Sequence, residues 1–89
     1  MKPTKTVIIT GTSRGIGFEL IHLFHKAGYA VLALSRNAKP VSNLNYENIT
    51  ALSFDLNRPE DYCRVEDFIQ KEWTHVDILI NNAGAIVNK

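Results

Sequence analysis

The sequence has little cysteine, no excess of charge of either sign and no long apolar run. Cys63 is the only cysteine among the 89 residues, which excludes an internal disulfide and fits the reducing cytoplasm. The formal net charge is +1 and no block of basic residues occurs, so nothing indicates a nucleic acid or an anionic membrane as a partner. No apolar stretch approaches the length of a membrane-spanning helix. These absences predict a cytoplasmic protein that binds neither nucleic acid nor membrane.

The composition that is present is typical of a globular protein. Hydrophobic residues make up 45% of the chain and charged residues 21%, which excludes an intrinsically disordered polypeptide. With 89 residues, the chain forms at most one small domain.

A glycine-rich stretch, Thr-Gly-Thr-Ser-Arg-Gly-Ile-Gly at residues 10–17, is the most informative segment. It follows a β-branched apolar run at 6–9 and precedes a helical pattern at 18–26 that Gly28 ends. A strand, a glycine-rich turn and a helix N-terminus together can bind phosphate, because glycines allow close approach and the first helical N–H groups are unpaired. The spacing G-x-x-x-G-x-G is neither the common G-x-G-x-x-G fingerprint nor a P-loop. By itself the stretch therefore indicates either a nucleotide site or a tight strand-to-helix turn.

The remaining pattern alternates strands and helices. Further strands are predicted at 29–34, 49–54 and 76–81, a helix at 57–73, and only a short turn at 41–44. This order predicts an α/β fold with a Rossmann-type doubly wound parallel sheet, truncated after the fourth strand, in which the strands lie in the order 3-2-1-4.

Helical spacing also predicts which side chains are buried. The first helix is expected to bury a stripe, and the second helix, with Asn57 as N-cap candidate, to bury another. His22 and His25 are expected to be solvated surface residues rather than metal ligands, so no metal site is predicted, and Cys63 is expected to be inert packing or surface. The predicted stripes are Ile16, Leu20, Leu23, Phe24 and Ala27 in the first helix, and Tyr62, Val65, Phe68, Ile69 and Trp73 in the second.

Three separated motifs carry a family resemblance. They are the glycine-rich turn at 10–17, the pair Asp55-Leu56 after the third predicted strand, and Asn-Asn-Ala-Gly at 81–84 after the fourth. With these motifs in this order, the chain resembles the N-terminal half of a short-chain dehydrogenase/reductase. Each motif falls at the carboxyl end of a strand, where ligands bind in open α/β sheets. The resemblance implies a cofactor-binding portion, residues 1–89, of a dinucleotide-binding domain.

The resemblance implies a role for each motif. The turn is expected to present its backbone to the cofactor phosphates, and Asp55 to accept a hydrogen bond from the adenine amino group beside the Leu56 backbone. Asn82, Ala83 and Gly84 are expected to lie against the adenosine ribose, although such an Asn pair can simply satisfy loop backbone groups. The turn residues in this implied site are Gly11, Thr12, Ser13, Arg14, Gly15, Ile16 and Gly17.

The second predicted strand ends without an acidic residue, which bears on the choice of cofactor. Enzymes that select NAD usually place an acid there to bind the ribose 2′-hydroxyl. This chain instead has Arg36, and Arg14 lies in the turn, so two guanidinium groups are candidates to bind a 2′-phosphate. We therefore expect NADP(H) rather than NAD(H). The alternative is that both arginines are ordinary surface charges.

The catalytic Tyr-x-x-x-Lys pair of the resembled family does not occur in the chain. Tyr29, Tyr46 and Tyr62 are followed four places later by alanine, threonine and glutamate. The resemblance therefore implies that the catalytic half is absent and that the chain alone is inactive, while the intact enzyme would transfer hydride to or from a carbonyl or alcohol substrate. An uncovered fourth strand predicts a homo-oligomer or aggregation. The alternative function is a non-catalytic nucleotide-binding or interaction module.

Overall fold

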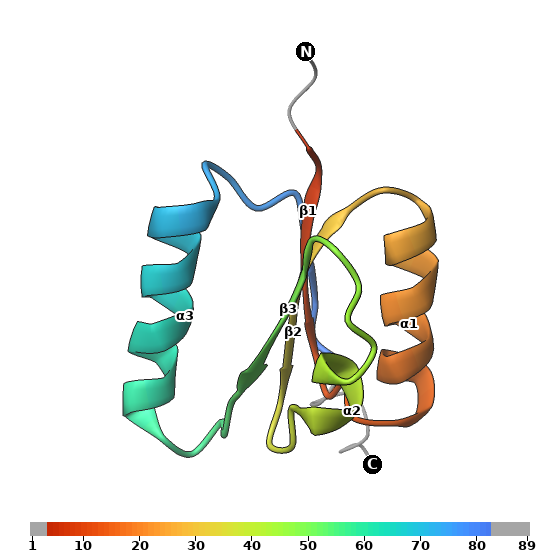
Figure 1. Cartoon of the computed structure of the whole chain (residues 1–89). Helices are drawn as coiled ribbons and strands as arrows, with labels where there is room; N and C mark the ends of the chain where they lie inside the picture. The colour runs from red at the N-terminus through yellow and green to blue at the C-terminus, as the bar shows by residue number, and fades with distance from the viewer. Residues whose placement is uncertain (1–3, 83–89) are drawn as a thin grey trace.

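The computed structural model describes residues 4–82, in which strands and helices alternate along the chain (Figure 1). The elements are β1 (Thr6–Thr10), α1 (Gly15–Lys26), β2 (Ala30–Ser35), α2 (Lys39–Ser42), β3 (Ile49–Ser53), α3 (Pro59–Glu72) and β4 (Ile78–Ile80). Every predicted element is present, with boundaries that differ by a few residues.

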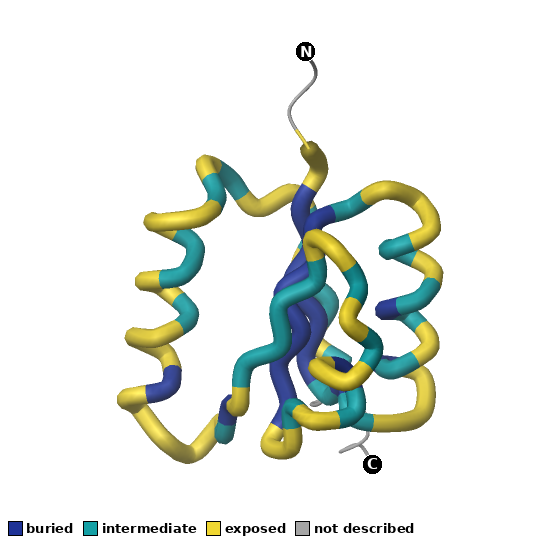
Figure 2. The backbone as a smooth tube through the Cα atoms, in the orientation of Figure 1, coloured by how far each residue is buried: buried dark blue, intermediate teal, exposed yellow. Residues whose placement is uncertain are grey.

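The four strands form one parallel sheet in the order β3-β2-β1-β4, which confirms the predicted topology. In register, Val7 of β1 lies beside Val31 of β2 on one side and beside Ile78 of β4 on the other. All residues of the two central strands are buried, because each strand has a neighbour on both sides and helices over both faces. The outer strands β3 and β4 are less buried (Figure 2).

Helices cover the two faces of the sheet unequally. Helices α1 and α2 lie on one face and α3 lies on the other (Figure 1). Alternate residues of the strands supply two separate cores: Val7 and Ile9 pack toward Ile21 of α1, whereas Ile8 and Leu32 belong to the cluster beneath α3. The parallel strands therefore have the buried, two-faced character that their continuous apolar runs predicted.

The buried face of α1 differs from the predicted stripe. Ile16 and Leu23 are 73% and 62% exposed, whereas Ile21 is completely buried. The helix faces the sheet through Gly17 and Ile21, with Phe24 partly buried at the rim of the same core. The predicted stripe is therefore confirmed at Leu20 and Phe24, which pack against this core, and wrong at Ile16, Leu23 and Ala27, which are exposed. Periodicity missed the centre of the buried face because glycine has no side chain to mark its own position there.

His22 and His25 are partly buried, so the prediction that they are solvated surface residues was wrong. The Nδ1 atom of His22 lies 2.9 Å from the Tyr46 hydroxyl oxygen, and the His25 ring stacks on the Tyr46 ring at 3.9 Å. These contacts attach the segment before β3 to α1. Within residues 4–82, no three His, Cys, Asp or Glu side chains are grouped to hold a metal ion.

Helix α3 packs on the second face mostly as predicted. Val65, Phe68, Ile69 and Trp73 lie against the sheet, and Cys63 is exposed. Tyr62 is an exception, since it is 47% exposed. The N-cap is Arg58 rather than Asn57, and its side chain makes no capping hydrogen bond.

Strand β4 has an uncovered face, as expected for the fourth strand. Leu79 is 66% exposed although its neighbour in register, Ile8, is buried beneath α3. Among the helices of residues 4–82, none has the length and apolarity needed to cross a membrane.

Candidate functional site

The carboxyl ends of the four parallel strands lie at one edge of the sheet, at the bottom of the view in Figure 1. We call the segments that follow these ends, residues 11–17, 36–37, 54–57 and 81–82, the carboxyl edge. All predicted site residues within the described range lie there, and Ala83 and Gly84 fall outside the described residues. The structure therefore brings the described residues of the three sequence motifs to a single edge, as the resemblance implied.

The glycine-rich turn depends on glycine for two different reasons. Gly11 and Gly15 have φ angles of 66° and 65°, in the left-handed region that favours glycine. Gly17 has an ordinary backbone but no room, because a Cβ atom there would lie 2.1 Å from the Gly11 carbonyl oxygen and 2.7 Å from the Asn82 Nδ2 atom. The turn thus folds back tightly onto the first residues of α1.

Asn82 connects the fourth strand to this turn. Its side-chain amide donates a hydrogen bond of 3.1 Å to the carbonyl oxygen of Gly11. Asn81 accepts a hydrogen bond of 3.2 Å from the Thr10 hydroxyl in the same region. The adjacent asparagines therefore hold the end of β4 against the end of β1, and Asn82 alone takes the backbone-satisfying role that the sequence left open.

Thr12 fixes the turn to the second strand. It is fully buried, and both its N–H group and its hydroxyl donate to the Leu34 carbonyl oxygen, at 3.3 and 3.2 Å. These bonds use the polar side-chain atom of Thr12 within the protein. Its predicted contact with a cofactor remains a prediction.

The N-terminus of α1 is open to a ligand. The N-cap Arg14 is extended, its side chain makes no capping hydrogen bond, and no acidic residue occurs in the first turn. The first N–H groups of a helix lack intrahelical acceptors, and the helix dipole makes this end positive. Ser13 is half-buried beside it, and Ile16 is exposed. This end of α1 is suited to bind an anion.

Hydrogen bonds order the segment after β2. The Ser35 hydroxyl donates to the Asn37 carbonyl oxygen at 2.7 Å, and the Ser53 hydroxyl donates to the Arg36 carbonyl oxygen at 3.2 Å. The Arg36 backbone is therefore held between two strand ends while its side chain is exposed. Within residues 4–82, the guanidinium groups of Arg14 and Arg36 make no hydrogen bond or ion pair.

The segment after β3 is positioned by residues of α3. The Asp61 carboxylate is buried and accepts a hydrogen bond of 2.9 Å from the Asp55 N–H group. One oxygen of Asp55 in turn accepts the Asn57 N–H group at 2.9 Å, and the Tyr62 hydroxyl donates to the Leu56 carbonyl oxygen at 3.1 Å. Asp55 is half-buried and the Leu56 side chain is 51% exposed, so both still border solvent.

The sequence alone did not identify Asp61 and Tyr62 as positioning residues. Asp61 was recognisable only as an acid at a positively polarised helix end. Its position two residues after Pro59, in the first turn of α3, is the available signal, because acids there often accept backbone N–H groups of the preceding loop.

A carboxyl group with a lowered pKa, Asp77, lies at the opposite edge of the sheet. There the Thr6 N–H group donates to the Asp77 carboxylate at 2.8 Å and holds the pKa of Asp77 below its ordinary value. Asp77 is therefore a feature of the amino edge and not of the candidate site.

Comparison with known proteins identifies the same family that the three motifs resemble. The family model for short chain dehydrogenases matches residues 5–89. The chain is 30% identical to the NADPH-dependent 1-acyldihydroxyacetone phosphate reductase of Saccharomyces cerevisiae, over 93% of this chain and 30% of that protein. The chain therefore spans about a third of the length of this curated relative.

Solved structures show the same arrangement. Menthone neomenthol reductase from Mentha piperita superposes with a TM-score of 0.77 at 28% identity, over 91% of this chain and 32% of the other. A 4-hydroxyisoleucine dehydrogenase complexed with NADH superposes with a TM-score of 0.78 at 28% identity, over 91% of this chain and 34% of the other. With a Rossmann-type sheet and its motifs at the carboxyl edge, the chain belongs to the short-chain dehydrogenase family.

Proposed function

We propose that the chain binds NADP(H) at the carboxyl edge and is the cofactor-binding part of an oxidoreductase that acts on a carbonyl or alcohol. The observation that carries the proposal is the convergence of Gly11, Gly17 and Asn82, in which Gly17 packs directly against the Gly11 carbonyl group and the Asn82 amide, with an uncapped helix N-terminus beside them. Residues from two distant motifs build this arrangement together. A purely structural turn would not require the uncapped, positively polarised helix end.

The pyrophosphate is assigned to the first turn of α1. The N–H groups of Gly15, Ile16 and Gly17 occupy the helix positions that have no intrahelical acceptor. The dipole of the twelve-residue helix makes this end positive, and no acidic residue in the first turn offsets that charge. Ser13 adds a hydroxyl at the entrance of the turn.

The additional phosphate of NADP is assigned to Arg14 and Arg36. Both side chains are exposed, and neither is paired with an acid among residues 4–82. Because β2 ends at Ser35 and is followed by Arg36 rather than by an acid, a 2′-phosphate meets no like charge there. Relatives differ in this respect, since one is named as NADPH-dependent and another was solved with NADH.

The adenosine is assigned to Asp55, Leu56, Asn82, Ala83 and Gly84. Asp61 fixes the backbone of Asp55, so that its carboxylate borders solvent in a defined position. When bound, the dinucleotide supplies the hydride chemistry, and these residues bind and orient it.

The single cysteine supports a reducing location such as the cytoplasm.

A non-catalytic nucleotide-binding module is the second candidate. Its supporting observation is that no Tyr-x-x-x-Lys occurs in the 89 residues, so we propose that the chain by itself does not transfer hydride. NADPH oxidation with a panel of aldehydes and ketones tests this. If the chain alone oxidises NADPH at a rate that saturates with both NADPH and the carbonyl compound, the inactive module is refuted.

Calorimetric titration with NADP⁺ and NAD⁺ tests the cofactor assignment. We expect the wild-type chain to prefer NADP⁺, and Arg36→Asp to weaken NADP⁺ binding by about tenfold to a hundredfold, as expected for loss of a charge-assisted hydrogen bond. Lys26→Asp makes the same change of charge in the last turn of α1, away from the carboxyl edge, and is the matched control. Absence of binding to either dinucleotide refutes the proposal, whereas an unchanged preference in Arg36→Asp removes only Arg36 from it.

A further inference from the structure

The loop between α3 and β4, residues 73–77, carries three side chains that contact one another in series at the amino edge of the sheet, at the top of the view in Figure 1. The Thr74 hydroxyl oxygen lies 2.9 Å from Nδ1 of His75, and Nε2 of the same ring lies 3.0 Å from a carboxylate oxygen of Asp77. A hydroxyl, an imidazole and a carboxylate linked in this order form the arrangement that activates a hydroxyl group as a nucleophile.

Strand β1 holds this series of side chains in place. The Asp77 carboxylate oxygen that contacts His75 also accepts the Thr6 N–H group at 2.8 Å. The Thr6 hydroxyl donates to the His75 carbonyl oxygen at 2.8 Å, and the Asp77 N–H group donates to the Thr6 hydroxyl oxygen at 3.1 Å. Thr6 is buried at the start of a central strand, so His75 and Asp77 are both fixed to the centre of the sheet.

The charge of Asp77 decides which nitrogen of His75 carries the hydrogen. Because the Thr6 N–H group lowers the pKa of Asp77, the carboxyl group is ionised at neutral pH and can only accept hydrogen bonds. Nε2 of His75 therefore donates to it, and in the neutral ring Nδ1 is left as the acceptor for the Thr74 hydroxyl hydrogen. Nδ1 is thus positioned to take the proton of Thr74.

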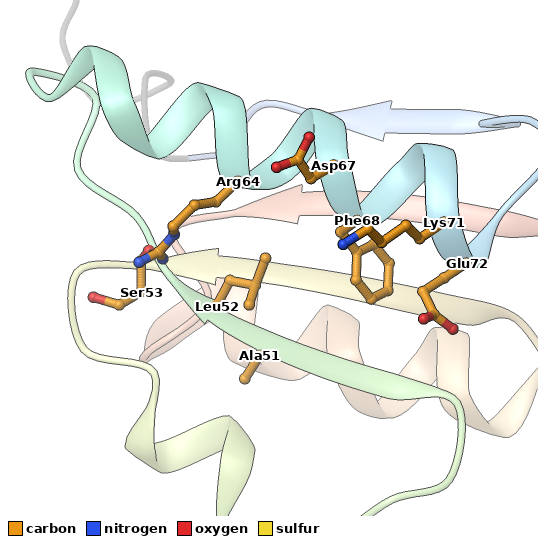
Figure 3. A pocket seen from close by; sticks show the side chains of 8 residues that line it. All are labelled: Ala51, Leu52, Ser53, Arg64, Asp67, Phe68, Lys71 and Glu72. Carbon is orange, nitrogen blue, oxygen red and sulfur yellow. The ribbon is translucent and has the colours of Figure 1, made fainter.

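A cavity of about 340 Å³ lies beside these side chains, and Thr74 and His75 line it. The rings of Phe68 and Trp73 supply aromatic surface and meet edge to face, with their centroids 5.4 Å apart. Figure 3 shows the Phe68 ring between α3 and β3, where it also borders a neighbouring groove. A cavity of this size holds a small organic molecule, and aromatic walls favour an apolar group.

Other side chains that line the cavity restrict the chemistry further. Asn48 and Thr50 make no side-chain hydrogen bond within residues 4–82, so an amide and a hydroxyl are available as donors. Donors of these kinds stabilise the negative charge that develops on a carbonyl oxygen under nucleophilic attack. Glu72 also lines the cavity, and its carboxylate repels an anionic substrate.

We propose that this cluster is a hydrolytic site, in which the Thr74 hydroxyl accepts the acyl group of small, uncharged carboxylic esters. The Thr74 oxygen bonds to the ester carbonyl carbon while its proton passes to Nδ1 of His75. The bond from that carbon to the leaving oxygen then breaks, and the alcohol leaves with the proton.

Water completes the proposed reaction. Its oxygen attacks the acyl carbon while one of its protons passes to Nδ1 of His75. The bond to the Thr74 oxygen then breaks, that oxygen takes the proton back, and a carboxylic acid is released. The site needs no cofactor and lies opposite the carboxyl edge, so it is independent of the proposed function.

Hydrolysis of p-nitrophenyl butyrate by the purified chain tests the proposal. We expect a rate that saturates with the ester, and a butyryl group on Thr74 when acid-quenched protein is mapped by mass spectrometry. Thr74→Val replaces the hydroxyl by a methyl group at an exposed position, so the variant should fold but lose both signals. Thr74→Ser keeps the hydroxyl and should retain both. His75→Gln removes the base and should lower the acylation rate by about a hundredfold or more.

Asp77→Asn separates a positioning role from a structural one. The asparagine amide can donate to Nε2 of His75 and so permits the form of the ring with hydrogen on Nδ1, which cannot take the proton of Thr74. The acylation rate at saturating ester should fall by about tenfold or more, while the ester concentration at half saturation stays unchanged.

His25→Gln is the matched control, because it removes a partly buried imidazole of α1 outside the cavity and should leave the rate unchanged. An unchanged rate in Thr74→Val overturns the proposal. A butyryl group found only on other residues also overturns it, as does a loss of rate in His25→Gln equal to that in His75→Gln, because hydrolysis would then come from exposed histidines in general.

Discussion

The Asn82 side-chain amide donates to the Gly11 carbonyl oxygen at 3.1 Å, although 71 residues separate the two positions. The same amide nitrogen lies where a side chain at position 17 would have to pass. The end of β4 therefore fixes the shape of the glycine-rich turn. This relationship brings motifs that lie far apart in the sequence together at one place in the fold.

Asn82→Asp is expected to destabilise the fold by about 1–3 kcal/mol, because aspartate cannot donate and its carboxylate would face the Gly11 carbonyl oxygen. NADP⁺ binding should weaken as well, since the turn loses its anchor. Asn81→Asp is the matched control, because Asn81 uses its oxygen to accept from Thr10 and aspartate keeps that acceptor. Urea unfolding measures both variants, and equal losses of stability would contradict the assigned role of Asn82.

Gly17→Ala is expected to destabilise the protein by about 1–3 kcal/mol and to abolish NADP⁺ binding, because the new methyl group would lie 2.1 Å from the Gly11 carbonyl oxygen. Gly15→Ala separates steric overlap from backbone strain. Gly15 has a φ of 65° and open space around it, so its substitution costs only the left-handed backbone, about 1–2 kcal/mol. Gly15→Ala should still fold. Thermal unfolding should show a smaller loss of stability for it than for Gly17→Ala, and calorimetry should show a smaller loss of NADP⁺ affinity. Cofactor binding retained by Gly17→Ala would exclude the close approach as a requirement.

Asp61→Ala is expected to lower the free energy of unfolding by about 1–3 kcal/mol, because the Asp55 N–H group loses its acceptor in a partly buried place. Asp61→Asn keeps an oxygen acceptor but loses the charge near the positive end of α3, so its loss should be smaller. Denaturant unfolding ranks the two variants. If Asp55 binds the adenine, Asp61→Ala should also lose more NADP⁺ affinity than Asp61→Asn. An unchanged NADP⁺ affinity in Asp61→Ala would mean that Asp61 does not position the cofactor site.

The sequence was sufficient to predict the strand order and the edge that carries the motifs. Continuous apolar runs identify strands buried on both faces, and alternation with helices restricts the topology to a parallel sheet. Because each motif directly follows a strand, all motifs had to reach the same edge. These inferences depend on local pattern and connectivity alone.

The details that the sequence missed depend on contacts between distant residues. Nothing near His22 indicates that Tyr46 will lie against it, since 24 residues separate them. Ile16 looked like a core residue, but it lies at the exposed N-terminal end of α1, beside the candidate phosphate site. Asn57 was a better N-cap candidate by residue type than Arg58, yet Asn57 instead donates its N–H group to Asp55. In each case a tertiary contact or position outweighed the local preference.

Asp77 makes the stability of the amino edge dependent on pH. Hydrogen bonding from the Thr6 N–H group, followed by the nearby His75 ring, lowers the pKa of Asp77 below its ordinary value of 3.8. A carboxylate with a lowered pKa in the folded state stabilises the fold fully above pH 3.8, and this contribution is lost as the pH falls from 3.8 through the lower folded-state value. The stability difference between wild type and Asp77→Asn should therefore be present above pH 3.8 and shrink as the pH falls below that value. Urea midpoints measured across this range, with Glu66→Gln as an exposed control, test it, and a difference that stays constant with pH would mean that the charge of Asp77 does not stabilise the fold.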